Sequence, residues 1–116
     1  MSIMTKPITV VEIPPFPSAA SEIWSEAERS DFIDFIARNP TAGDVIRGSG
    51  GIRKVRWSRT GMGKRGGARV IYYYHSERLP LFLLTAYPKS QRDTLTDAQV
   101  TLMAKIVATI LERYLK

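Results

Sequence analysis

Three strand-like runs follow one another between residues 52 and 87, and this pattern constrains the fold more than any other feature. The first run, residues 52–59, alternates charged and apolar side chains, as a strand with one buried face does. The second run, residues 68–75, is rich in β-branched and tyrosine residues. The third, residues 81–87, reads LFLLTAY and is typical of a central strand covered on both faces. We therefore predict an antiparallel meander.

Further elements are predicted before this meander. Residues 8–13 form a β-branched run that ends at consecutive prolines, which indicates one more strand. Ser25 and Glu28 match the capping box S-x-x-E, so a helix is expected to begin at Ser25, with a short helical turn ahead of it. The helix should end at Asn39, because a following proline disfavours the helical conformation there.

A second capping box lies near the end of the chain, where Thr96 is followed by Gln99. Apolar side chains then recur at helical spacing through residues 97–115, which predicts an amphipathic helix packed on the sheet. The chain is about the size of one domain, so we expect residues 1–116 to form a single α+β unit with a mixed, mostly antiparallel four-stranded sheet, N-terminal helices and a C-terminal helix.

Positive charge is concentrated in the meander. The chain has 17 Lys and Arg against 11 Asp and Glu, a net charge of +6, and no acidic residue stands between Asp44 and Glu77. A solvated surface normally mixes both signs, whereas a one-sided cationic surface becomes favourable when phosphates displace its counterions. RNA or DNA is therefore the expected partner. The cations of this stretch are Arg47, Arg53, Lys54, Arg56, Arg59, Lys64, Arg65 and Arg69.

Several function classes are excluded or disfavoured by composition. The chain contains no cysteine, which excludes disulfides, thiolate metal sites and thiol nucleophiles, and its single histidine, His75, removes mechanisms that need two imidazoles. We expect neither a metal nor another cofactor. The glycine-rich segments GSGG and GMGKRGG match neither common nucleotide-binding pattern. No apolar stretch is long enough for a membrane span or a signal peptide, so a cytoplasmic location is expected.

The chain resembles the RelE/HigB superfamily of bacterial type II toxins, particularly its HigB-like branch, in three segments: GDVIRGSGGIRKVRW, GKRGGARVIYYY and LFLLTAYPKSQRDTLT. The resemblance implies a small RelE-like fold and a metal-independent, ribosome-dependent endoribonuclease that cleaves mRNA by 2′-hydroxyl attack and inhibits translation. It also implies contacts with rRNA, neutralisation by a cognate helix-turn-helix antitoxin, and contact with operator DNA only through that antitoxin.

The resemblance assigns catalytic roles to basic residues of the hairpin and of the turn after the third run: Lys54, Arg56, Arg69 and Lys89. Further residues are expected to contact RNA: Arg53, Arg59, Lys64, Arg65, Tyr87 and Arg92.

One departure from the family concerns tyrosine. RelE itself has an active-site tyrosine near its C-terminus, but Tyr114 falls in the apolar stripe of the last helix, so that role is not carried over to it. Tyr87 is the candidate substitute, for stacking or for proton transfer. Trp57 shares the phase of apolar Val55 and is predicted to lie in the core.

The expected chemistry uses the arginines for charge and the lysines for protons. Arg56 and Arg69 suit a phosphate-like transition state, because guanidinium binds two phosphate oxygens at once. Lys54 or Lys89 would serve as base or acid, and the sequence does not distinguish them. Two alternatives stay open, namely a non-catalytic RNA-binding or ribosome-binding module and a ParE-type toxin that poisons DNA gyrase.

Overall fold

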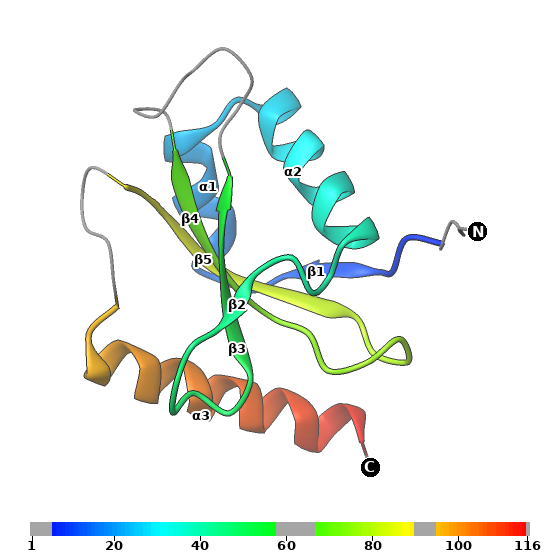
Figure 1. Cartoon of the computed structure of the whole chain (residues 1–116), viewed down its shortest axis with the longest axis vertical. Coiled ribbons are helices and arrows are strands. Elements are labelled where there is room, and N and C mark those ends of the chain that lie inside the picture. Colours follow the sequence, from blue (N-terminus) through cyan, green and yellow to red (C-terminus); the bar gives the residue numbers. More distant parts are fainter. Residues whose placement is uncertain (1–5, 58–66, 90–94, 116) are drawn as a thin grey trace.

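The computed structural model describes residues 6–57, 67–89 and 95–115, which form three helices and five strands (Figure 1). In chain order these are β1 (Val10–Glu12), α1 (Phe16–Ile23), α2 (Glu26–Arg38), β2 (Asp44–Val45), β3 (Ile52–Trp57), β4 (Ala68–Tyr73), β5 (Leu81–Pro88) and α3 (Asp97–Tyr114). The α+β class predicted from the sequence is confirmed.

The strands form one mixed sheet in the order β1-β5-β4-β3-β2. β3, β4 and β5 make the predicted antiparallel meander, and β1 pairs with β5 in parallel. β5 therefore has a neighbour on each side, and its residues Leu81–Leu84 are all buried. The apolar composition of LFLLTAY is explained by this central position, because both of its faces are covered.

The expected number of strands was wrong, because a fifth strand, β2, completes the sheet. β2 has only two residues, Asp44 and Val45, which pair with Lys54 and Arg53 of β3. Such a short strand shows no alternating pattern in the sequence. Contacts beyond its two residues hold it, including a bond from the Ile46 N–H to the Ile52 carbonyl at 2.8 Å.

The sheet separates two apolar clusters. On one face, side chains of α1 and α2 such as Phe16 and Phe32 pack against Val70 and Leu83. Trp57 belongs to this side and lies against Phe32 with ring centroids 5.5 Å apart, so its predicted core position is confirmed. On the other face, α3 packs over the sheet (Figure 1).

Local sequence sets the ends of the two long helices. α2 begins after the Ser25 capping box and is capped at its C-terminus by Asn39, as predicted. α3 begins after the Thr96 capping box and ends at Tyr114. The element ahead of α2 is longer than the expected turn, because α1 is a helix of 8 residues. None of the helices in the described segments combines the length and apolar character that a membrane span requires.

Candidate active site

The C-terminal helix covers only part of its face of the sheet. Ile52, Ile71 and Phe82 lie in the apolar cluster under α3. Because side chains alternate between faces along a strand, Lys54 and Arg56 of β3 project from the same face as Ile52. The basic side chains of the hairpin thus continue the surface on which α3 packs.

Strand register brings two arginines together on this face. Arg56 of β3 is paired directly with Arg69 of β4, and Arg69 is paired in turn with Tyr87 of β5. Directly paired residues of an antiparallel sheet place their Cβ atoms about 4.5–5.5 Å apart on one face. Arg56, Arg69 and Tyr87 therefore form a row across three strands.

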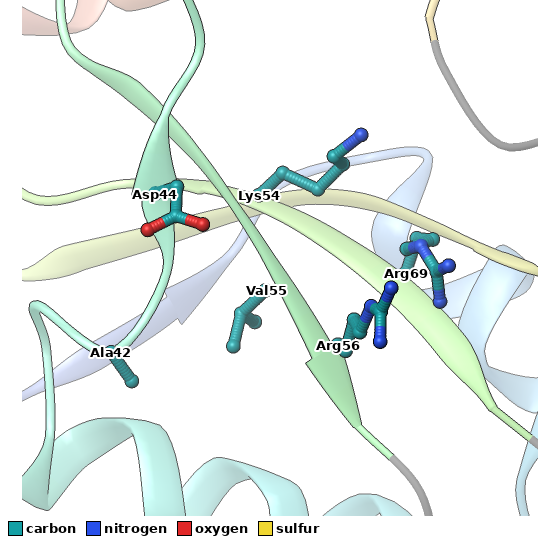
Figure 2. A pocket seen from close by; sticks show the side chains of 6 residues that line it. All are labelled: Ala42, Asp44, Lys54, Val55, Arg56 and Arg69. Atoms are coloured by element: carbon teal, nitrogen blue, oxygen red, sulfur yellow. The ribbon is translucent and has the colours of Figure 1, made fainter. Parts of the chain in front are cut away.

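A cleft of about 430 Å³ lies beside this row (Figure 2). Asp44 and Arg69 lie on opposite sides of β3, and the Lys54 side chain extends away from the Asp44 carboxylate. The residues lining the cleft are Ala42, Asp44, Lys54, Val55, Arg56 and Arg69. Three of the four residues predicted to be catalytic therefore share one concave surface.

The two arginines differ in burial. Arg56 is exposed, whereas Arg69 is only 4 % exposed. The Arg69 side chain thus lies within the packed structure, which is unusual for a charged residue. Like charges directly opposite one another destabilise a sheet. An anion bound between the two guanidinium groups would offset such repulsion.

Tyr87 extends the row but is only 3 % exposed and belongs to the apolar cluster on the α3 side. A ring so placed offers no face for stacking on a base in this conformation. Its register places it opposite Arg69 across β4 and β5.

Arg53 is separated from the other hairpin cations. It lies on the opposite face of β3 from Lys54, and its guanidinium donates to the Gly43 carbonyl at 2.6 Å. The Gly43 N–H donates to the Tyr72 hydroxyl at 2.9 Å, and that hydroxyl donates to the Pro40 carbonyl at 2.8 Å. We call Arg53, Gly43, Tyr72 and Pro40 the Gly43 network. It anchors the chain just ahead of β2 and gives Arg53 a structural role, while its contact with RNA stays a prediction.

Asp44 is the residue of the cleft that sequence reasoning missed. It immediately precedes the acid-free stretch, and the undetected strand β2 places it directly opposite Lys54. Within the described part of the chain, its carboxylate forms no ion pair. The available signal was its position as the last acid before the basic run.

The remaining predicted residues lie elsewhere. Lys89 is exposed after β5, and its N–H donates to the Gly67 carbonyl at 3.1 Å, which places it near the start of β4 but outside the lining of the cleft. His75 is exposed on the surface and does not line the cleft. Arg59, Lys64, Arg65 and Arg92 lie outside the described residues. Within the described ranges, no three acidic or histidine side chains are grouped as a metal site requires.

The Gly43 network gives a prediction for alkaline pH. Burial raises the pKa of the Tyr72 phenol above its usual 10.0, although the Gly43 N–H and Arg53 lower it. Folded Tyr72 thus keeps a proton that the unfolded chain releases, so its contribution to the free energy of unfolding is complete below about pH 10 and is lost as the pH rises through the folded pKa. Tyr72→Phe should flatten this decrease.

The measurement for Tyr72→Phe is a series of urea unfolding curves from neutral pH to above pH 10. At neutral pH the variant should lose about 1–3 kcal/mol, because the Gly43 N–H and the Pro40 carbonyl lose their partner. Tyr74→Phe, which removes a hydroxyl just after β4, is the control. Equal alkaline slopes for wild type and Tyr72→Phe would contradict the assignment.

Comparison with known families places the residues of the cleft within a matched region. A family model described as the RelE toxin of the RelE / RelB toxin-antitoxin system matches residues 37–116. The match covers more than half of the chain and includes every residue that lines the cleft.

Proposed function

The chain belongs to the RelE toxin family and is a toxin of a toxin–antitoxin system; from this premise we propose that it is a ribosome-dependent endoribonuclease that cleaves mRNA. The observation that carries the proposal is the direct pairing of Arg56 with Arg69 in a cleft that also contains Lys54. These are the residue types that a metal-independent cleavage of RNA through its own 2′-hydroxyl requires.

The arginine pair would bind the phosphate that is cut. Attack of the 2′-hydroxyl adds negative charge to the phosphate oxygens, and guanidinium groups positioned before the reaction stabilise that charge without reorganising. Each guanidinium can bind two oxygens in one plane, which a lysine cannot do. Unlike Tyr87, Arg69 lines the cleft despite its burial, so it would set the orientation of the phosphate, and exposed Arg56 would close on it from the solvent side.

Proton transfer would fall to Lys54 and Asp44. The two residues are paired across β2 and β3 and line the cleft together. A carboxylate can accept the proton of the attacking hydroxyl, and an ammonium can donate one to the leaving oxygen, provided that both reach the reacting atoms. Lys89 remains a candidate donor from the turn after β5.

The ribosome would supply the orientation of the substrate. The cleft is open, and only one lysine and one carboxylate in it can transfer protons. Free RNA would therefore adopt a reactive geometry there only rarely. Holding two reactants in a reactive geometry can lower a barrier by about 7–11 kcal/mol. A ribosome that presents the mRNA in a fixed path can provide this contribution, with the basic surface also contacting rRNA.

The test is primer extension on mRNA from cells after induced expression, together with purified protein, programmed ribosomes and a defined mRNA. We expect growth arrest, cuts inside reading frames, and cleavage only when ribosomes are present. Intact mRNA with ribosome binding would instead indicate a non-catalytic module. Gyrase-dependent DNA breaks would indicate a ParE-type activity.

An antitoxin partner follows from the family. We infer that this partner is a helix-turn-helix protein, which would mediate any contact with operator DNA, and that it carries acidic side chains where it meets the surface of Lys54, Arg56 and Arg69. Binding of that kind weakens as salt screens the charges. Membership of the HigB-like branch and a cytoplasmic site of action belong to the same proposal.

A further inference from the structure

A second cleft, of about 420 Å³, adjoins the first and shares Lys54 with it. It lies between the turn that joins β2 to β3 and the N-terminal part of α3. The residues lining it are Ile46, Arg47, Gly48, Lys54, Leu95, Asp97, Val100 and Thr101. None of the roles assigned above uses this cleft, although a surface that binds an RNA chain must accept more than one nucleotide.

The turn that forms one wall of the second cleft has a defined shape. Gly48, Gly50 and Gly51 have φ angles of 75°, 79° and 109°, which side chains with a Cβ rarely adopt. Ser49 is 3 % exposed, and its Oγ donates to the Ile46 carbonyl at 2.6 Å and accepts the Ile52 N–H at 2.9 Å. The glycine-rich segment thus builds a rigid wall that presents Arg47 at its edge.

The lining of the second cleft has the chemistry of a base-binding site. Ile46, Leu95 and Val100 supply apolar surface, and exposed Arg47 supplies a planar cation. Unpaired RNA bases are recognised by stacking on aromatic rings or on guanidinium planes. Asp97 supplies a hydrogen-bond acceptor for the polar edge of a base.

The position of Lys54 connects the two clefts. It lines both of them, with the arginine pair on one side and the apolar surface on the other. A phosphate held by Arg56 and Arg69 would therefore direct the next unit of the chain past Lys54. The first cleft has three cationic side chains and suits the phosphate, whereas the second combines three aliphatic side chains with Arg47 and suits the base.

We propose that the second cleft binds the base of the nucleotide adjacent to the phosphate that Arg56 and Arg69 hold. This inference rests on the proposed endoribonuclease function and adds a substrate-positioning site to it. Arg47 stacks on the base, and the apolar side chains of the cleft contact its other surface. Lys54 lies where the two clefts meet.

The test fills the second cleft with a large side chain. Thr101 is exposed and lines the cleft, so the indole of Thr101→Trp would occupy the space of the base. Ala108 is exposed on α3 about two turns further on and lines neither cleft, so Ala108→Trp is the matched control. Cleavage of a defined mRNA on programmed ribosomes is measured for both variants, after circular dichroism has confirmed the same fold.

We expect Thr101→Trp to lower kcat/KM by about tenfold to a hundredfold, the range of losing one stacked base. Most of the change should appear in KM, and Ala108→Trp should match wild type. Arg47→Ala should also lower kcat/KM. Arg47→Lys should recover only part of that loss, because a point charge cannot stack. Arg78→Ala, at an exposed arginine that lines neither cleft, controls for net charge.

The outcomes separate the two proposals. If wild type cleaves mRNA and Thr101→Trp equals or exceeds Ala108→Trp in kcat/KM, the base-binding site is overturned and the endoribonuclease proposal stands. If Arg47→Lys equals wild type, charge alone acts at that position and the stacking role is overturned. If wild type leaves mRNA intact on ribosomes, the endoribonuclease proposal fails, and the base-binding site fails with it.

Discussion

Replacing Arg69 with alanine is expected to lower ribosome-dependent cleavage by about 100-fold to 1000-fold, the range for removing one group that stabilises developing negative charge. Arg69 is the buried member of the arginine pair, and its guanidinium is held by packing as well as by its own strand. A group fixed in this way gives more stabilisation than a mobile one, because little rearrangement is needed during the reaction. The effect should therefore exceed that of Arg56→Ala.

Because Arg69 is buried, its substitution needs stability controls that a substitution of exposed Arg56 does not need. Arg69→Ala leaves a space in the structure, although it also removes repulsion from Arg56 opposite. Arg69→Met fills much of the same volume without charge, and Arg69→Lys keeps the charge without the planar group. Urea unfolding gives the stability of each variant, and Arg78→Ala controls for net charge.

Arg69→Met should be folded and inactive, and Arg69→Lys should regain only part of the rate. The measurement is single-turnover cleavage of mRNA on ribosomes. Near-wild-type cleavage by a folded Arg69→Met protein would place the phosphate elsewhere on the hairpin.

The parts of the fold that could be predicted are those with local signals. The capping boxes at Ser25 and Thr96 mark helix starts because the bonds involved lie within four residues. The central position of β5 was predictable because only a strand covered on both faces tolerates uninterrupted apolar residues. These features depend on short segments of chain, so a single sequence contains them.

The missed parts depend on contacts between distant residues. β2 has two residues and no pattern, and a network that joins Pro40, Gly43 and Tyr72 holds it. Asp44 lies in the cleft because β2 places it there, so its position could not be predicted without predicting that strand. Arg53 was grouped with the other cations by its sequence position, whereas strand alternation turns it to the opposite face.

Gly43→Ala, a substitution within the same network, is expected to destabilise the fold. A Cβ at this position would lie 2.8 Å from the Lys54 carbonyl oxygen and 2.9 Å from Cε1 of Tyr72. Neither atom can move freely, since one belongs to the backbone of β3 and the other to a ring that is 0 % exposed. Forcing an extra methyl group into a packed site costs about 1–3 kcal/mol, and we expect a loss of stability in that range.

Gly43→Ala should also reduce cleavage in protein that is still folded. The crowded atoms belong to Lys54 and Tyr72, and relieving the contact means moving β2 away from β3, which displaces Asp44 from its place opposite Lys54. Urea unfolding measures the stability, and cleavage is assayed well below the melting temperature. Thr41→Ala, at an exposed position two residues earlier, is the control and should change neither quantity. A destabilised Gly43→Ala protein with full activity would show that the chemistry does not depend on the pairing of Asp44 with Lys54, and cleavage would then rest on the arginine pair and Lys54 alone.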